Sequence, residues 1–334
     1  MNKKLLFFLS STMFVCYGAE QYRHGIRENL YNVVDVCTAQ NKRPYQEDRT
    51  SGALYNKGYL FGVLDGHDSD HVAVHVAEQF PYAFAYYLAK SLPEKRAFEE
   101  SFSLMEEYAT QTYKGGSTAV FVYVKAGKVH VAHIGDSRVV CGNKNSIMFA
   151  TQDQTLARED ERERVLQAGG ILFRDRKRDG QALGPWRINC LGMSRSIGDG
   201  WSKGKFPKLG GRIAPAMRLR QSGDSKVEIY VEQWPNIMQE NTWKILPQIG
   251  QVIAEPEYAE HQLTDAHQWL ILATDGLWDV VDNHEALMMA QEYYDTHGLR
   301  GIARFLCDHA IARESADNIT VMVVDLLNLP QQQP

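Results

Sequence analysis

Three aspartates lie at the ends of apolar segments, where a rigid backbone would hold each carboxylate in place. They are Asp65 after YLFGVL, Asp275 after LILAT and Asp317 before NITVMVV. Taken singly, an Asp-Gly pair after a strand predicts only a tight turn. Three carboxylates that converge would repel one another unless a cation lay between them. Carboxylate and carbonyl oxygens suit Mg2+ or Mn2+ better than zinc, so the pattern indicates a site for a hard metal ion.

Two nearby segments carry further groups suited to phosphate chemistry. The guanidinium of Arg43 can bind two phosphate oxygens at once, which a lysine cannot do in the same geometry. The adjacent acids Glu47 and Asp48 could reach the same site through bound water. His67, two residues after Asp65, could protonate a departing alkoxide because imidazole titrates near neutral pH. Considered alone, His67 would more simply be a surface or core histidine.

The composition is that of a globular chain. Its 334 residues are 44% hydrophobic and 23% charged, with a formal net charge of -5, unlike disordered, collagen-like or membrane-spanning chains. The mild acidity argues against broad binding of nucleic acid. No internal repeat or Gly/Ser linker divides the chain, so we expect one domain over residues 22–329 and a monomer. No C-x-x-C pair occurs; Cys141 and Cys307 lie in apolar stretches and are expected to be small buried hydrophobes.

The first residues have the layout of a secretory signal peptide. Two lysines within residues 1–4 precede a largely apolar run at 5–15 and then small residues, which predicts removal of residues 1–19. The apolar run is shorter than the roughly 20 residues of a membrane-spanning helix, so no stable membrane span is expected. We therefore expect entry into the secretory pathway and a secreted or organelle-stored protein. An N-terminal segment of a cytoplasmic protein is the alternative.

The spacing of apolar residues predicts the elements that would position the chemical groups. Strands are indicated at 59–64, 117–124, 129–134, 138–141, 269–273 and 319–326. Helical spacing occurs near 70–90, 95–113, 157–168, 284–296 and 300–313. Hairpin-rich strands favour mainly antiparallel sheets, with the helices covering their outer faces.

A series of short motifs resembles the protein phosphatase 2C family in both content and order. They are RPYQED (43–48), DGH (65–67), GGSTA (115–119), IGDSR (134–138), SRSIGD (194–199), DGLWD (275–279) and DN (317–318). The resemblance extends from about residue 35 to residue 326. It implies an α+β fold, an αββα sandwich in which two packed, mainly antiparallel β-sheets are flanked by helices.

By this resemblance the chain is a metal-dependent protein serine/threonine phosphatase that acts on phosphorylated proteins. Two Mg2+ or Mn2+ ions would activate a water molecule for attack on phosphorus. Asp65 would bridge the ions, and the other implied ligands are the Gly66 carbonyl, Asp275 and Asp317. Asp136 and Asp279 match positions that can hold a weaker third ion.

The same resemblance implies roles for the remaining site residues. Glu47 and Asp48 would act mainly through metal-bound water, Arg43 would bind the substrate phosphate, and His67 would be the general acid. The alternative is a catalytically inactive, phosphatase-like binding scaffold, but such members lack one or more ligand acids that are all present here. A two-metal nuclease is a further alternative, for which the chain has no nucleic-acid-binding motif.

The chain departs from the family pattern at two places. After DGH the family usually has Gly-Gly, whereas Asp68 and Ser69 follow here. Asp tolerates a positive φ less well than Gly, which puts the loop conformation in doubt, and its charge would shift metal affinity. The second departure is a segment of about fifty residues, 200–251, where relatives carry a shorter flap. We expect this insert to recognise substrate or regulate access, with an added hairpin of no special role as the alternative.

A short basic cluster occupies residues 174–178, with the sequence RDRKR. A solvated loop is the plain interpretation. The sharper hypothesis is nuclear import or binding of an acidic partner, which together with the signal peptide would mean export followed by nuclear entry.

Overall fold

The computed structural model describes residues 32–170, 172–177, 182–188, 191–203, 225–230 and 251–330. The expected signal peptide at 1–19 lies outside the described residues, as does most of the expected insert at 200–251. Within the described part of the chain, no helix has the length and apolar character needed to cross a membrane.

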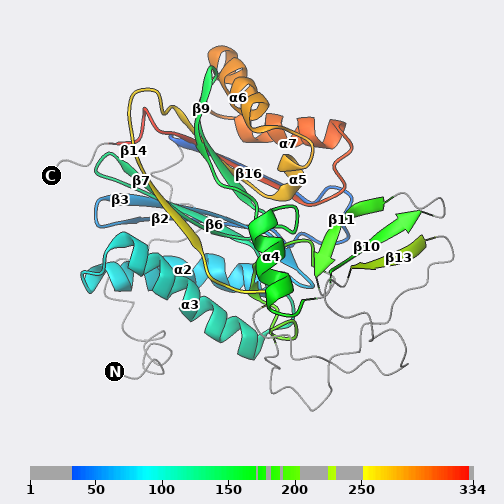
Figure 1. Cartoon of the computed structure of the whole chain (residues 1–334). Coiled ribbons are helices and arrows are strands. Elements are labelled where there is room, and N and C mark those ends of the chain that lie inside the picture. The colour runs from blue at the N-terminus through cyan, green and yellow to red at the C-terminus, as the bar shows by residue number, and fades with distance from the viewer. Residues whose placement is uncertain are drawn as a thin grey trace, which may run out of the picture.

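Two five-stranded antiparallel sheets form the centre of the molecule (Figure 1). The first has the strand order β14 (Glu257–Gln262), β7 (Lys128–Ile134), β6 (Ala119–Lys125), β3 (Gly58–Leu64) and β2 (Arg49–Tyr55). The second has the order β1 (Val34–Ala39), β16 (Ile319–Asp325), β15 (Trp269–Ala273), β8 (Arg138–Asn143) and β9 (Ser146–Ala150).

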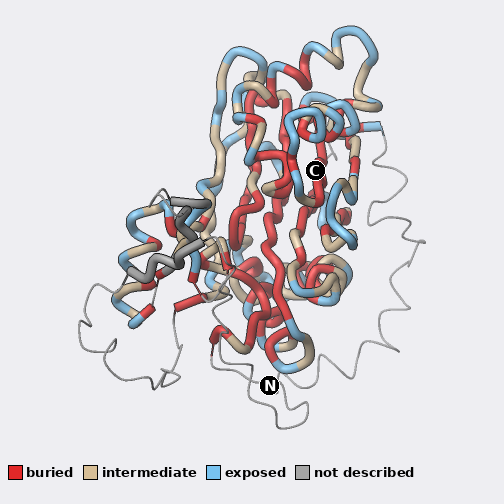
Figure 2. The backbone as a smooth tube through the Cα atoms, turned by 90° about the vertical axis from the view of Figure 1, so that its right-hand side faces the viewer, coloured by how far each residue is buried: buried red, intermediate tan, exposed pale blue. Residues whose placement is uncertain are grey.

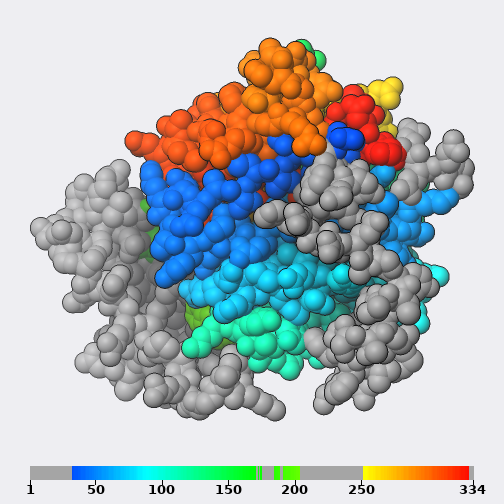
Figure 3. Space-filling model, turned by 180° about the vertical axis from the view of Figure 1, so that it is seen from behind, coloured from blue at the N-terminus to red at the C-terminus, as the bar shows by residue number. Residues whose placement is uncertain are grey.

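Helices cover the outer face of each sheet, which completes an αββα sandwich (Figure 1). The first sheet is covered by α2 (His71–Ala89) and α3 (Glu94–Thr112). The second is covered by α6 (Asn283–His297) and α7 (Ile302–Ala312). Figure 3 shows the N-terminal part of the described chain, in blue, at the surface between these two helical layers. The predicted α+β sandwich is confirmed.

The side chains of β3 show why its sequence is an unbroken apolar run. Successive residues of a strand point to opposite faces of the sheet. Phe61 and Val63 pack into the layer between the two sheets, whereas Leu60 and Leu64 pack beneath α2 and α3. Both faces of the strand are therefore buried, and Figure 2 shows the same burial along the central strands. The strand is a rigid support for the residue that follows it.

A smaller three-stranded sheet lies beside the sandwich near α4 (Glu159–Gln167) (Figure 1). Its order is β11 (Ala182–Ile188), β10 (Leu172–Lys177) and β13 (Ser225–Tyr230). The expectation of a loop at 174–178 is wrong for residues 174–177, because all four pair with β13, and Asp175 and Arg176 also pair with β11. The guanidinium of Arg174 lies 4.7 Å from the Trp186 ring centroid, a cation–π contact that a solvated loop would not provide.

A second small sheet contains β12 (Ile197–Gly198), β5 (Gly116–Ser117) and β4 (Gly66–His67). The one-turn helix α5 (Asp275–Trp278) follows β15. These short elements carry several of the predicted site residues. As predicted, Cys141 and Cys307 are buried and free.

Candidate functional site

One end of the β2–β3 hairpin holds two of the predicted acids. Arg49 is paired with Leu64 in the strand register. Asp48 precedes Arg49 and Asp65 follows Leu64, so the two aspartates continue the same ladder beyond its last pair. The fixed register of an antiparallel pair thus sets one carboxylate beside the other.

The neighbouring end of the second sheet holds two more of the acids. Ala273 is paired with Val321, so Asp275 leaves β15 at the end where Asp317 leads into β16. The Thr274 hydroxyl donates a hydrogen bond of 3.1 Å to Asp48 Oδ2. This contact joins the two sheets at the site.

The carboxylates are close enough to disfavour one another's ionisation. Burial, followed by the charges of Asp48, Asp275, Asp136 and Asp317, raises the pKa of Asp65 well above its usual range. Burial and the charges of Asp136 and Asp317 do the same to the pKa of Asp275. Residues that are far apart in the sequence therefore form one electrostatic group, as predicted from their positions at strand ends.

Of the flanking acids, Asp48 and Asp136 belong to the same electrostatic group. Burial raises the pKa of Asp48 to about 7, although hydrogen bonds from the hydroxyls of Thr320 and Thr274 favour its charged form. Burial and the charge of Asp153 raise the pKa of Asp136 to about 7. Burial likewise raises the pKa of Glu47.

Asp279 lies at the end of α5 and faces the same group. Burial, followed by the charges of Asp153 and Asp317, raises its pKa, while the charge of Arg138 lowers it. Arg138 donates to both carboxylate oxygens of Asp153, at 2.8 Å and 2.6 Å. Asp136 and Asp279 are thus next to the predicted metal ligands, with Asp153 as a third acid that the sequence did not single out.

The donor set fits a hard divalent cation. Asp48, Asp136 and Asp275 each keep a buried Oδ1 with no hydrogen-bond partner among the described residues. A buried carboxylate oxygen without a partner is costly unless a ligand completes it. Anionic oxygens that repel one another are the donors that Mg2+ and Mn2+ prefer.

A different acidic cluster has closer oxygens but is already neutralised. Asp160, Glu161 and Glu257 form the one group of three acids among the described residues whose oxygens lie within 4.8 Å of one another. Arg158 donates to Glu257 at 2.8 Å and 2.9 Å, and Arg195 donates to Glu161 at 2.5 Å. These acids serve an ion-pair network between α4 and β14, and the network leaves little need for a cation.

Arg43 and Asp317 form an ion pair at the edge of the site. The side chain of Arg43 is 51% exposed, so it can also reach a ligand in solvent. Asn318 holds the segment that carries Arg43. Its Oδ1 accepts from the Glu47 amide at 2.9 Å, and its Nδ2 donates to the Tyr45 carbonyl at 2.9 Å. The DN motif at 317–318 marks Asn318 in the sequence, but only these contacts show that Asn318 positions the segment that carries Arg43.

His67 belongs to β4 and forms an ion pair with Asp199, with 2.7 Å between Nε2 and Oδ2. Burial alone would lower the pKa of His67, but the charge and hydrogen bond of Asp199 outweigh it and raise the pKa. The next residue, Asp68, has φ 61° and so adopts the left-handed conformation typical of glycine. The expected ligand Gly66 is the first residue of β4 and lies between Asp65 and His67.

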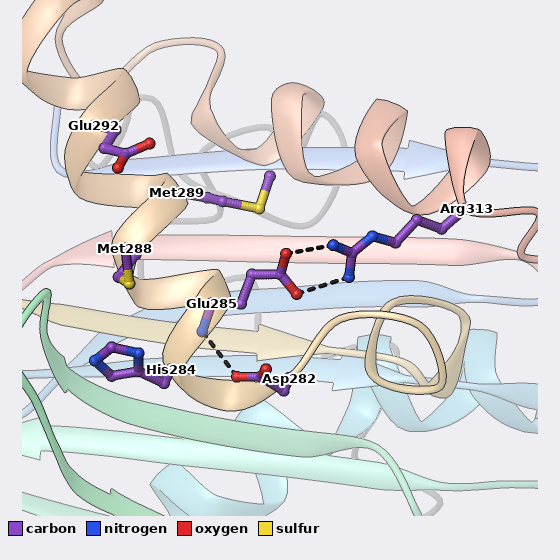
Figure 4. A pocket seen from close by; sticks show the side chains of 7 residues that line it. All are labelled: Asp282, His284, Glu285, Met288, Met289, Glu292 and Arg313. Atoms are coloured by element: carbon purple, nitrogen blue, oxygen red, sulfur yellow. Dashed lines mark hydrogen bonds and ion pairs between the residues drawn. The ribbon is translucent and has the colours of Figure 1, made fainter.

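A surface pocket lies elsewhere, on the outer side of α6 (Figure 4). Its Glu285 carboxylate binds Arg313 at 2.5 Å and 2.7 Å, and the Glu285 amide donates to the capping Asp282 at 2.9 Å. None of the predicted site residues lines this pocket. Its charged groups stabilise the start of α6.

Comparisons with known proteins identify one family. A family model described as Protein phosphatase 2C matches residues 28–319. "Probable protein phosphatase 2C 7" of Oryza sativa subsp. japonica is 27% identical over 294 residues, which cover 86% of this chain and 63% of the relative. "Probable protein phosphatase 2C 76" of Arabidopsis thaliana is 27% identical over 308 residues, which cover 89% and 60%. The chain thus spans about three fifths of the length of these curated relatives.

Solved structures share the fold. A serine-threonine phosphatase 2C from Toxoplasma gondii superposes with a TM-score of 0.61 at 19% identity, covering 87% of this chain and 94% of that one. A C. elegans sex determining protein superposes with a TM-score of 0.65 at 21% identity, covering 96% and 70%. At these identities the likeness concerns the fold alone.

Proposed function

Because the chain belongs to the protein phosphatase 2C family, we propose that it is a metal-dependent phosphatase that hydrolyses phosphoserine and phosphothreonine in proteins. The observation that carries this proposal is the group of half-buried, mutually repelling carboxylates centred on Asp65 and Asp275. Carboxylates that repel one another destabilise the folded protein unless a cation neutralises them, so such a group indicates a metal site.

The metal ligands would be Asp65, the Gly66 carbonyl, Asp275 and Asp317, with Glu47 and Asp48 acting through water. When bound, two Mg2+ or Mn2+ ions would lower the pKa of a water molecule and neutralise charge that develops on the phosphate. Asp136 and Asp279 would serve a weaker third ion.

The protein's own groups would bind the phosphate and deliver a proton. Arg43 is half-exposed, and its guanidinium would exchange the Asp317 carboxylate for two phosphate oxygens. Asn318 keeps the segment of Arg43 and Glu47 in place through its contacts with both ends of that segment. His67, paired with Asp199, would donate a proton to the departing serine or threonine oxygen.

An inactive binding scaffold is the rival proposal. Such a protein would not need the complete set of acids. Here every predicted ligand side chain is present, and the charge coupling of Asp65 and Asp275 with their neighbours supports a metal-binding role. Catalysis explains their presence better.

The proposal is tested by hydrolysis of a phosphothreonine peptide by the purified chain with EDTA, Mg2+ or Mn2+. We expect turnover only with metal, and a loss of about 100-fold or more in kcat/KM for Asp275→Asn, because a displaced metal ion removes several kcal/mol of transition-state stabilisation. Asp35→Asn is the matched control: Asp35 accepts from the Gly301 and Ala303 amides near α7, away from the site. A folded chain without turnover under any metal would favour the scaffold.

A further inference from the structure

His67 sits in a small sheet whose other strands come from distant parts of the chain. In this sheet β5 lies between β4 and β12. His67 is paired with Gly116 on one side, and Gly116 is paired with Gly198 on the other. Asp199 follows Gly198 directly, so the sheet places its carboxylate across Gly116 from the imidazole.

Gly116 leaves the space through which the two side chains meet. A Cβ at this position would collide with Asp199 Oδ2 and would lie 2.7 Å from His67 Nε2. Only glycine therefore permits the 2.7 Å contact between Nε2 and Oδ2. The second glycine of the GGS sequence is explained by this contact rather than by a turn.

Asp199 is held more firmly than an ordinary surface acid. It is fully buried, its Oδ2 also accepts from the Ser196 hydroxyl at 2.6 Å, and its amide donates to the Gly115 carbonyl at 2.8 Å. Its carbonyl accepts from the Ser202 amide at 2.8 Å. Both the side chain and the backbone of Asp199 are thus fixed.

The segment around Asp199 is anchored to the helical layer. Glu106 of α3 accepts from the Gly198 amide at 2.9 Å and from Lys203 Nζ at 2.9 Å. Lys203 Nζ also donates to the Ser196 carbonyl at 2.8 Å. Residues on both sides of Asp199 are therefore tied to one buried carboxylate.

We propose that Asp199 is the positioning residue for His67: it binds Nε2–H and so fixes the ring with Nδ1–H as the proton donor to the leaving oxygen. This inference rests on the proposed function. Nε2 is occupied by Asp199, whereas Nδ1 has no hydrogen-bond partner among the described residues, and the His67 side chain is 20% exposed. Nδ1 is therefore the ring nitrogen left to donate to substrate. A carboxylate that orients an imidazole and fixes its tautomer is an established use of a buried aspartate in catalysis.

Asp199 would assist the cleavage of the phosphoester bond through the proton that His67 donates. A bond forms between phosphorus and the oxygen of the attacking water, and the bond from phosphorus to the serine or threonine oxygen breaks. The electron pair of the broken bond stays on the leaving oxygen, which takes the proton from His67 Nδ1. The proton of the attacking water passes to solvent, which later reprotonates His67.

The test compares two substrates that differ in their need for a proton. A phosphothreonine peptide releases an alkoxide and needs a general acid, whereas p-nitrophenyl phosphate releases a stabilised phenolate and needs little help. We expect Asp199→Asn to lower kcat for the peptide by about 100-fold and for the aryl phosphate far less. The His67→Gln variant should show the same selective loss, and the double variant should lose no more than either single one.

Two further variants keep the result interpretable. Gly116→Ala keeps the side chains of His67 and Asp199 but separates them, so it should show the same selective loss as Asp199→Asn. It provides the test if Asp199→Asn does not fold. Asp35→Asn, which removes a partly buried aspartate elsewhere, should not alter the ratio between the substrates.

The outcomes distinguish a failure of the positioning role of Asp199 from a failure of the proposed phosphatase function. Equal losses on both substrates, or additive losses in the double variant, would overturn the positioning role of Asp199. A wild-type chain that hydrolyses neither substrate with Mg2+ or Mn2+ would instead refute the proposed function.

Discussion

Asp68 places a negative charge in left-handed backbone next to the candidate metal ligands. Its φ of 61° is the left-handed conformation that glycine adopts at little cost, and Asp68 adopts it here. Its charge contributes to the raised pKa of both Glu47 and His67, after the larger effects of burial and of closer charged groups. Asp68 thus stands in left-handed backbone where the family usually has glycine, and it adds a negative charge beside Glu47 and His67.

We predict that Asp68→Asn weakens Mg2+ binding by about two- to five-fold, because an exposed charge near a cation contributes a modest, screened attraction. Isothermal titration with Mg2+ measures the effect. Asp68→Gly is the matched comparison and should weaken binding equally, since the two variants remove the same charge. Unchanged or tighter binding in both variants would show that Asp68 does not act on the metal site through its charge.

At the scale of elements, the site depends on where strands end. The ends of β3 and β15 provide Asp65 and Asp275, and the starts of β2 and β16 follow Asp48 and Asp317. The ion-pair network of α4 and β14 also binds the segment that leads into β12, and Asp199 follows β12 directly. Glu161 accepts from the Ser194 hydroxyl at 2.6 Å and from Arg195 at 2.5 Å.

We predict that Glu161→Gln destabilises the protein by about 3 kcal/mol at neutral pH, because it removes the buried anion that faces the partly buried guanidinium groups of Arg164 and Arg195. Burial alone would raise the pKa of Glu161, but hydrogen bonds from Arg195, Arg164 and Ser194 outweigh it and lower the pKa to about 2. The unfolded chain then binds more protons than the folded one between about pH 4.5 and pH 2. The stability from Glu161 is therefore present above this window and is lost as pH falls through it.

Urea unfolding at several pH values measures this difference. The gap between wild type and Glu161→Gln should be widest at neutral pH and should close towards pH 2. Asp308→Asn is the control, because Asp308 pairs with Arg304 on the exposed face of α7 and its loss should change little. A gap that is the same at all pH values would contradict the role assigned to the Glu161 carboxylate.

The long apolar strands were predictable because both of their faces are buried. β3, β6, β15 and β16 have such continuous runs, and the acids at their ends were identified with them. β9 and β14 are edge strands with mixed sequences, SIMFA and EYAEHQ, and have no comparable signal. The charged sequence of β10 predicts a loop, because these residues gain their strand conformation only from cross-strand partners.

The role of Asp199 could not be predicted from spacing for a similar reason. His67 and Asp199 are 132 positions apart and meet only through the pairing of three two-residue strands. The motif SRSIGD marked the position of Asp199 without indicating its partner. Asn318 and Thr274 acquire their roles in the same way, from contacts between the loops and strand ends of the folded chain.

At the scale of the whole molecule, the sandwich buries repelling carboxylates where its two sheets meet. The layer of apolar side chains between the sheets holds the two strand ends together against this repulsion. The metal-free protein is therefore expected to be less stable at this end of the sandwich. Cations that bind only the folded state would raise its free energy of unfolding.

The most direct test of this account is a titration of Mn2+ into the metal-free chain that counts bound ions and follows turnover of a phosphothreonine peptide. We predict that turnover rises as a second ion binds each chain, and that Asp65→Asn, which removes the carboxylate proposed as a shared ligand, abolishes both the paired binding and the turnover. Turnover that persists in EDTA, or that is unaffected in a folded Asp65→Asn variant, would contradict the two-metal phosphatase.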